Sequence, residues 1–558
     1  MKKFFEKYIL ISFVSILGLQ SCNVLDLDPT KWYGENVVYA SESNMDLYVK
    51  DFYILLYKNA DIGNSELIMD DGFSDLIKYS WFNVKGGIVN KFFYLDNIIN
   101  PTSNFRSNWD SYYTYIRQMN ELFSDVNNGY ASKLDKNFVA TRVAEVRFLR
   151  AFAYQELVLR HGGVILRIDE NKVDGPKEKD KARSNEAECW DFIMNEYSKA
   201  IEALPESWPG ENLGRITKGA AYGMKARAAL YSQRWQDAVE ACDAVLALGY
   251  ALAEGDTYEK YYKIFTDKVN KELILPVLYQ QSSGNAGGKQ HNFNNNFCPP
   301  YDGHPFGVSV GAAASPTEEY ASMFDIKTGG EYKAFDWGQL AAYGNKPYDN
   351  REPRFYASIL YNGAKWKGRS LELYPDGKDG FMDFSITGQD NVHKTTTGYI
   401  FRKYMSDDNK LNFTNILSGQ YWIEIRLAEI YLIRSEAFAR LNNYSKAYED
   451  LNLIRTRVGL KGLPAKSDWD AYLQDLSKER VCELGLEGHR YFDLVRWGIA
   501  QKVMDGKRLH GVKINGTNYE VVECDTQDRR FPAKYNIFPI PYSEIKNNTL
   551  CEQNEVWK

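Results

Sequence analysis

The sequence lacks several features that would assign it a chemistry. It has six histidines in 558 residues, none at a metal-binding spacing, and no H-E-x-x-H motif. Its seven cysteines include no C-x-x-C pair, so neither a zinc site nor a dense disulfide framework is indicated. No Gly-rich loop that would cradle phosphate is found either. We therefore expect no metal and no cofactor.

An excess of positive charge is also missing. The net charge is −6, from 68 Lys and Arg against 74 Asp and Glu, and no basic patch stands out. Nucleic-acid binding relies on clustered lysines and arginines that neutralise phosphates, so we expect no nucleic-acid partner. After the first 20 or so residues no apolar run is long enough to cross a membrane as a helix, which takes about 20 residues.

The N-terminus has the pattern of an export signal. A basic start precedes an apolar run, residues 8–19, which is too short to span a bilayer. The run ends in Leu-Gln-Ser-Cys at Cys22, which resembles a bacterial lipobox. We expect residues 1–21 to be a signal peptide and Cys22 to carry lipid on the mature chain, 22–558. The alternative is an ordinary secretory signal with an incidental cysteine. Export allows one or two disulfides among the other six cysteines, whose pairing stays open.

Helical periodicity dominates both ends of the chain. Residues 141–160 and 185–203 each place apolar side chains on one face of a helix. Residues 219–248 predict a helical hairpin with small and apolar residues at the spacing of a tetratricopeptide repeat. A second hairpin, near residues 435–454, follows the same template. The sequence therefore predicts a mainly α fold built on helical repeats.

The middle of the chain, about residues 281–420, differs from the helical scaffold on either side, about residues 40–280 and 420–505. It is rich in Gly, Asn, Pro and Tyr and has little helical period. Long loops inside compact proteins are usually functional or disordered, and the many aromatic residues argue against disorder. We predict a loop-rich insert with short strands, packed on the scaffold within a single domain.

Two motifs could carry catalysis. Residues 307–311 match G-x-S-x-G around Ser309, a nucleophile elbow that needs a strand before it and a helix after it. Its place in a loop-rich segment favours a small-residue loop. Glu479, Glu483 and Glu487 could act as a glycosidase acid and base. Arginines interleave with them, however, and would lower their pKa values, so we favour a structural ion-pair network and predict no catalytic residue.

Seven short blocks, in order along the chain, resemble the SusD/RagB family of outer-membrane nutrient-binding lipoproteins. The most recognisable contains Glu-Gly-His-Arg followed by Phe-Asp-Leu and Arg-Trp. Glu352 and Ser435 depart from the family pattern, which has Asp and Ala there. The blocks are residues 144–164, 316–325, 350–355, 398–404, 426–437, 479–497 and 538–554.

The resemblance implies a superhelix of tetratricopeptide-like hairpins that carries the loop-rich insert. It also implies a lipid-anchored protein of the outer membrane, facing the cell surface, that is no enzyme. Such a protein binds a glycan or another nutrient and caps a SusC-like TonB-dependent transporter. Two alternatives remain: a surface glycan-degrading hydrolase, or a helical-repeat scaffold that binds proteins. The ligand itself cannot be read from the sequence.

Binding a sugar requires a flat aromatic side chain against its C–H face and polar groups for its hydroxyls. Two clusters offer both, one in a loop after the first helix and one in the insert, with two outlying residues. Each aromatic residue could instead belong to the core, where Trp and Tyr are common. The predicted ligand-binding residues are Asp70, Asp71, Trp81 and Asn83, then Asn296, Phe297, Tyr301 and Phe306, with Trp366 and Arg369 as the outliers.

Overall fold

The computed structural model describes most of the chain, including both helical ends and most of the insert. The predicted signal peptide and Cys22 lie outside the described residues. Within the described part, no helix is both long enough and apolar enough to span a bilayer. The described residues are 35–63, 69–80, 93–94, 99–102, 108–171, 179–280, 289–307, 309–383, 393–408 and 417–558.

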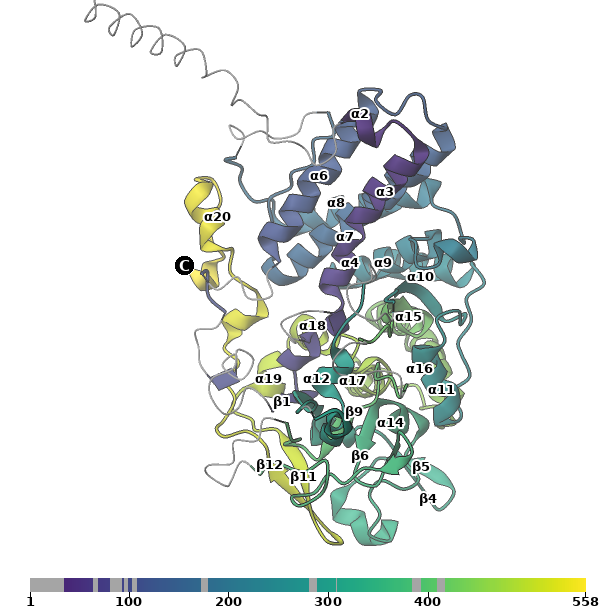
Figure 1. Ribbon diagram of the computed structural model, residues 1–558, viewed down its shortest axis with the longest axis vertical. Coiled ribbons are helices and arrows are strands. Elements are labelled where there is room, and N and C mark those ends of the chain that lie inside the picture. Colours follow the sequence, from purple (N-terminus) through teal and green to yellow (C-terminus); the bar gives the residue numbers. More distant parts are fainter. Residues whose placement is uncertain are drawn as a thin grey trace, which may run out of the picture.

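A stack of helices forms the N-terminal half (Figure 1). From α6 to α10, each helix packs against the next one along the chain. The helices are α2 (Glu35–Val38), α3 (Glu42–Phe52), α4 (Ile54–Asn59), α6 (Trp109–Asn127), α7 (Lys136–His161), α8 (Glu186–Ala203), α9 (Lys218–Tyr231), α10 (Trp235–Leu246) and α11 (Tyr258–Thr266).

Local sequence signals set the ends of these helices. The Asp135 carboxylate accepts a hydrogen bond from the Phe138 backbone N–H and caps the start of α7. Gly162, with φ of 69°, ends that helix in a conformation that favours glycine. Asn185 and Glu188 form a reciprocal capping box at the start of α8. The predicted helices over residues 141–160 and 185–203 are confirmed.

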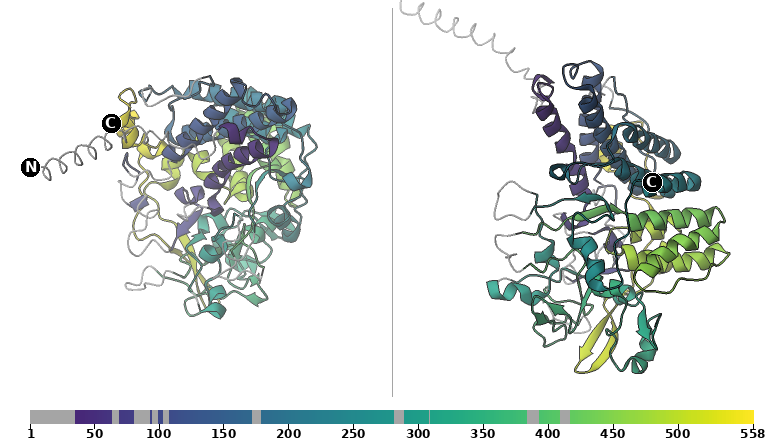
Figure 2. Two further views of the ribbon diagram at one scale, coloured as in Figure 1. Left: turned by 45° about the horizontal axis from the view of Figure 1, so that its top comes forward. Right: turned by 90° about the vertical axis from the view of Figure 1, so that its right-hand side faces the viewer.

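Both predicted hairpins are confirmed as well. In the first, α9 and α10 cross with small side chains between them, and Ala226, Ala229, Ala238 and Cys242 are all fully buried. The second hairpin consists of α15 and α16, and α15 also packs on α10, so the two hairpins stack into one superhelix (Figure 2). The C-terminal helices are α15 (Leu427–Arg440), α16 (Tyr444–Arg457), α17 (Trp469–Leu484), α18 (Arg490–Arg496), α19 (Ala500–Met504) and α20 (Tyr542–Asn547).

Residues between β2 (Leu273–Val277) and β10 (Trp422–Arg426) hold short helices and two-stranded sheets. β2 and β10 pair with each other, so the segment leaves and re-enters the scaffold at one place. The other strand pairs are β1 (Ile77–Tyr79) with β3 (Ala314–Pro316), β4 (Ile326–Thr328) with β5 (Glu331–Lys333), β6 (Ile359–Tyr361) with β9 (Tyr399–Phe401), and β7 (Lys365–Trp366) with β8 (Arg369–Ser370). The short α-helices are α12 (Phe293–Phe297), α13 (Glu318–Ala321) and α14 (Pro353–Ser358).

After the hairpin of β11 (His510–Asn515) and β12 (Asn518–Glu523), the chain returns to the N-terminal helices (Figure 1). The Phe538 backbone N–H donates to the Arg160 carbonyl at 2.6 Å, and the Asn554 amide donates to the His161 carbonyl. The six cysteines within the described residues are buried free thiols, so none of them forms a disulfide.

A buried ion-pair network ties the helical scaffold to the insert. Its centre is Arg426, which donates to Glu272, Glu483 and Glu487 at 2.6 to 2.8 Å. From the insert, Lys403 pairs with Glu487 at 2.6 Å. We call this set the Arg426 network, and its members are Glu272, Arg354, Lys403, Arg426, Arg457, Glu479, Glu483 and Glu487.

The predicted ion-pair role of the C-terminal glutamates is confirmed by this network. Burial alone would raise the pKa of Glu483, but Arg457, Arg426 and Arg354 hold it well below its usual range. Glu487 is buried too, and Arg426 and Lys403 lower its pKa to about 2. Both carboxylates are therefore ionised at neutral pH.

We expect the Arg426→Met substitution to lower the free energy of unfolding by roughly 3–5 kcal/mol, because it leaves buried carboxylates without their partner. Chemical denaturation followed by far-UV circular dichroism measures the change. Arg508→Met is the matched control, since Arg508 also binds two carboxylates but at the surface. The free energy of unfolding of the Arg508→Met protein should stay close to the wild-type value. Equal stability of Arg426→Met and wild type would contradict the central role of Arg426.

The effect of Arg426→Met should also depend on pH. The folded-state pKa of Glu487, about 2, lies below its ordinary value of 4.5, so the stabilisation is present above pH 4.5 and is lost as the pH falls towards 2. The difference in unfolding free energy between wild type and Arg426→Met should therefore narrow over that range. Denaturation curves at pH 7, 4.5 and 3 measure it, and a constant difference would contradict the assignment.

Candidate ligand-binding site

Two residues of the first predicted cluster are buried in the protein, and the other two lie outside the described part of the chain. Trp81 and Asn83 are the latter two. Asp70 and Asp71 lie in a 3-10 turn, η3 (Asp70–Phe73), and are 7% and 0% exposed. Asp70 accepts a hydrogen bond from the Arg160 guanidinium at 3.0 Å. Its carboxylate is thus held by a helix of the scaffold.

Asp71 connects the same turn to the start of α18. Its carboxylate accepts the backbone N–H groups of Gly488 and Arg490 at 3.1 and 2.9 Å. Burial raises the pKa of Asp71 to about 7, although these two hydrogen bonds oppose the rise. Asp70 and Asp71 therefore make contacts within the fold, and we leave them out of the binding surface.

The second predicted cluster also divides. Phe297, in α12, is 1% exposed and packs against Phe293 and Phe401 with ring centroids 4.7 and 5.5 Å away. It is part of the core. Asn296 is half-buried beside it. Phe306 ends the 3-10 helix η6 (Pro300–Phe306), and its side chain lies outside the described part of the structure.

The two outlying residues, Trp366 and Arg369, meet at the carboxylate of Asp302, the residue next to Tyr301. Asp302, in η6, accepts hydrogen bonds from the Trp366 indole N–H at 2.9 Å and from the Arg369 guanidinium at 3.1 Å. Trp366 and Arg369 belong to the tight hairpin of β7 and β8. Trp366 is 2% exposed, so it anchors this hairpin to η6. Arg369 remains at the surface.

Arg369 is held in a fixed position above the Tyr301 ring. Both of its terminal nitrogens donate to the Asp379 carboxylate at 2.6 Å. Its guanidinium carbon lies 5.1 Å from the centre of the Tyr301 ring. Burial alone would lower the pKa of Arg369, but Asp379 and Asp302 raise it. The cation is therefore pre-organised beside an aromatic ring.

Tyr301 and Arg369 belong to an exposed surface that we call the insert platform, made of Tyr301, His304, Arg369 and Lys378. The Tyr301 and His304 rings stack at 4.9 Å with 14° between their planes. Tyr301 is half-buried and His304 is exposed. The Lys378 ammonium lies 5.8 Å from the Tyr301 ring centre. Such a surface can stack on the C–H face of a sugar while the cations donate hydrogen bonds to its hydroxyls.

The possible catalytic motif does not have the geometry of a nucleophile elbow. Ser309 follows the helix η6 and precedes the strand β3, whereas an elbow needs a strand before the serine and a helix after it. Gly311 has φ of 84°, and a Cβ there would lie 2.2 Å from the Cys298 carbonyl oxygen. Gly311 therefore serves close backbone packing, whereas Gly307, with φ of 68°, ends η6. The described residues also contain no group of three or more His, Cys, Asp and Glu side chains that could hold a metal.

A groove that was not predicted from the sequence lies in the helical half. Its volume is about 1100 Å³, and α3, α4, α6, the 3-10 turn η5 (Gly210–Asn212) and β2 border it. We call it the tyrosine groove because Tyr48, Tyr53, Tyr57 and Tyr115 line it. Its contributing segments are far apart in the chain, which is why no local pattern marks it.

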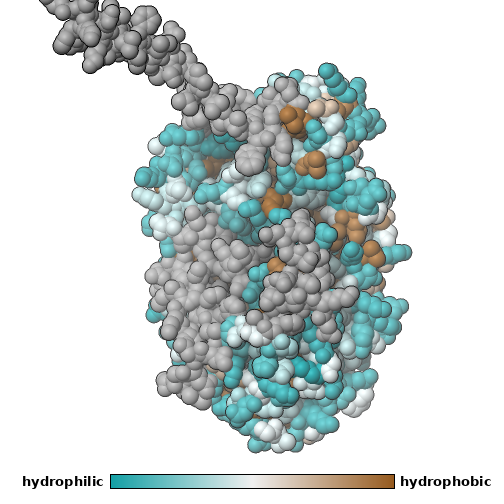
Figure 3. All heavy atoms as spheres, viewed as in Figure 1, coloured by the Kyte–Doolittle hydropathy of each residue, from teal (hydrophilic) through white to brown (hydrophobic). Residues whose placement is uncertain are grey.

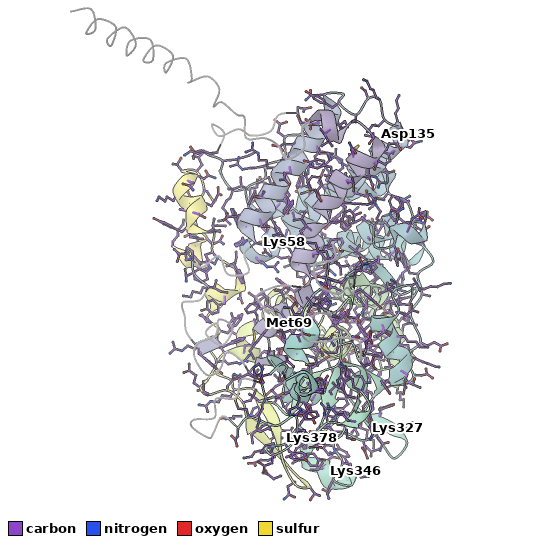
Figure 4. All side chains as sticks on the ribbon, in the orientation of Figure 1. Lys58, Met69, Asp135, Lys327, Lys346 and Lys378 are labelled. Carbon is purple, nitrogen blue, oxygen red and sulfur yellow. The ribbon has the colours of Figure 1, made fainter. Side chains whose placement is uncertain are left out.

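The insert platform and the tyrosine groove lie in different halves of the molecule. Figure 4 labels Lys378 of the platform in the lower half and Lys58, the neighbour of Tyr57 on α4, in the upper half. On the face shown in Figure 3, apolar side chains gather over the upper half around α3 and α4. Val37 of α2 and Leu47 of α3 are exposed.

Fold and surface together define an α-helical repeat protein whose loop-rich insert presents an aromatic and cationic platform. Comparison with protein families places it more narrowly. The SusD family model matches residues 271–557, and a second model, described as starch-binding associating with outer membrane, matches residues 36–230. The chain belongs to the SusD family, as the sequence blocks predicted.

Relatives and solved structures agree with this assignment. SusD-like protein P25 of Formosa agariphila is 23% identical, with 97% of this chain and 96% of that protein aligned. Starch-binding protein SusD of Bacteroides thetaiotaomicron is 26% identical over 74% of this chain and 72% of its own. A SusD-like protein of Bacteroides fragilis superposes with a TM-score of 0.74, 28% identity and coverage of 94% and 98%. A laminarin-binding SusD-like protein has a TM-score of 0.65, 22% identity and coverage of 92% and 99%. The predicted mainly α, tetratricopeptide-like fold is confirmed.

Proposed function

We propose that the mature chain, residues 22–558, is a glycan-binding lipoprotein of the outer membrane that hands its ligand to a SusC-like TonB-dependent transporter. The observation that carries the proposal is membership of the SusD family across both halves of the chain. Relatives named for starch and for laminarin binding support a carbohydrate ligand. Lipid on Cys22 would hold the protein beside the transporter at the cell surface.

The insert platform supplies the chemistry that binding requires. The stacked Tyr301 and His304 rings give an apolar face, on which the C–H face of a sugar can lie. Hydrogen bonds from a charged group such as Arg369 are worth about 1.5–3 kcal/mol. Because Arg369 is already fixed by Asp379, little side-chain entropy is lost when a sugar binds.

Hydrolysis of the glycan has less support than binding, because the glutamates that were considered as catalytic groups lack the properties of a catalytic acid. A glycosidase needs one carboxylic acid that stays protonated near neutral pH, and it needs that group in a cleft. Glu487 has its pKa lowered to about 2 and is buried against Arg426 and Lys403. We therefore propose binding without bond cleavage, and the ligand would leave chemically unchanged.

Replacing the platform should weaken glycan binding. We expect Tyr301→Ala and Arg369→Ala each to lower the affinity for the bound glycan about tenfold, which corresponds to about 1.4 kcal/mol. Affinity electrophoresis in gels containing laminarin or starch, followed by titration calorimetry, measures the change. Tyr542→Ala is the control, because Tyr542 is 54% exposed and lies on α20. Failure of wild type to bind any polysaccharide of a wider panel, or release of reducing ends, would overturn the proposed function.

Removing the lipid site should separate binding from uptake. We expect purified Cys22→Ala protein to bind the glycan as tightly as wild type, because Cys22 is not one of the residues of the insert platform. Cells carrying that variant should no longer retain the protein in the membrane fraction and should lose uptake of the glycan. Cys242→Ala, at a buried thiol in the scaffold, controls for loss of a cysteine. Reduced glycan affinity of the soluble Cys22→Ala protein would contradict the idea that the lipid serves membrane attachment and not ligand binding.

A further inference from the structure

The tyrosine groove is built from side chains fixed by three separate segments. The Tyr57 hydroxyl donates to the Leu278 carbonyl at 2.6 Å, and its ring packs edge-on against Tyr279. The Tyr53 hydroxyl donates to the Glu145 carboxylate at 2.7 Å. These bonds hold α4 against both the scaffold and β2. Two of the four tyrosines, Tyr53 and Tyr57, are therefore held in place.

The charged groups at the base of the groove are neutralised within the protein. Arg215 donates to Glu145 at 2.8 and 2.6 Å and to Asp46 at 2.7 Å. On the walls, Lys50 pairs with Asp46 at 2.7 Å and Arg117 with Glu121 at 3.3 Å. Four of the charged lining residues, Lys50, Arg117, Glu121 and Arg215, therefore already have partners before a ligand binds.

The lining as a whole carries as many cations as anions. Four cationic and four acidic side chains line the groove, so no net field selects an anionic or a cationic ligand. Between them lie the rings of four tyrosines and the amides of Gln118 and Asn212. The cationic residues are Lys50, Arg117, Arg215 and Lys289, and the acidic ones are Asp51, Glu121, Asp125 and Glu211.

This composition fits a neutral sugar chain better than a peptide helix. An amphipathic helix docks its apolar face in a hydrophobic groove, whereas here eight charged side chains and two amides are interspersed with the rings. Hydroxyl groups of a sugar can pair with carboxylates and amides while its C–H face covers a tyrosine. The volume, about 1100 Å³, lies above the usual range for sites that hold one small molecule, about 300–1,000 Å³, so several sugar units fit.

We propose that the tyrosine groove is a second glycan-binding site, which takes a segment of a neutral oligosaccharide several units long. The proposal rests on the proposed function, since it assumes that the protein binds glycans. Binding at two sites on one chain would favour a long polysaccharide over a short oligosaccharide through avidity. The two sites would bind the same polysaccharide chain at different points along its length.

The test replaces two groove residues on the outer face of α6. The groove variant carries Tyr115→Ala and Gln118→Ala, both at half-buried positions, and Tyr115→Phe keeps the ring as its matched control. Laminarin and starch are the probes, and thermal melting checks the fold of each variant. We expect the groove variant to lose at least fivefold in affinity for the polysaccharide that wild type binds, and Tyr115→Phe to remain within twofold of wild type.

Combination with Tyr301→Ala separates the two sites. We expect Tyr301→Ala alone to retain measurable binding and the combined variant to lose it. Wild-type affinity in the groove variant, or complete loss of binding in Tyr301→Ala alone, would overturn the second site while leaving the proposed function intact. If the groove variant no longer captures the transporter but binds the glycan with wild-type affinity, the groove is a protein-docking surface and the second glycan site is overturned. If wild type binds neither these probes nor the wider panel, both proposals fall together.

Discussion

The structure depends on one constraint: charges that leave water must find partners inside the protein. Arg426 stands where β10 ends and α15 begins, and three glutamates from two other parts of the scaffold surround it. Moving any of these elements would leave a charge buried and unpaired, which costs several kcal/mol. The network therefore fixes the relative positions of the elements rather than simply adding stability.

This constraint also determines where the insert lies. Arg354, the second residue of α14, donates to Glu479 and Glu483. Lys403, which lies just after β9, donates to Glu487. Two distant points of the insert are thus anchored on the same scaffold helix and the loop after it. Further buried pairs hold neighbouring loops in the same way, such as Arg490 with Asp75. A surface carried by loops can then be as precisely placed as one carried by helices.

The features that could be predicted from the sequence depend on neighbours in the chain. Capping residues, small residues at a helix crossing and a run of glutamates with arginines all act over a few positions, and the predicted helices, hairpins and ion pairs are confirmed. Contacts between distant segments leave no such pattern. Asp70 and Asp71 were predicted as ligand-binding residues of a loop, but their partners, Arg160 and the backbone at Gly488 and Arg490, come from elsewhere in the chain. The binding of Trp366 and Arg369 to Asp302, and the position of Arg369 over Tyr301, have the same origin, as does the tyrosine groove.

The aromatic residues fall into two classes, those that stabilise the fold and those that are available to bind a ligand. Phe297 and Trp366 were both reasonable sugar contacts by residue type, yet both are almost fully buried and hold loops together. Tyr301 and Tyr115 remain half-buried. Tyr301 lies beside Arg369, which Asp379 holds in place, and Tyr115 lines the groove together with Arg117 and Glu121, which pair with each other. A ring can stack on a sugar only where it keeps a wetted face, so exposure together with fixed polar neighbours distinguishes the two classes better than residue type does. That distinction selects the insert platform and the tyrosine groove from a chain in which 15% of the residues are aromatic.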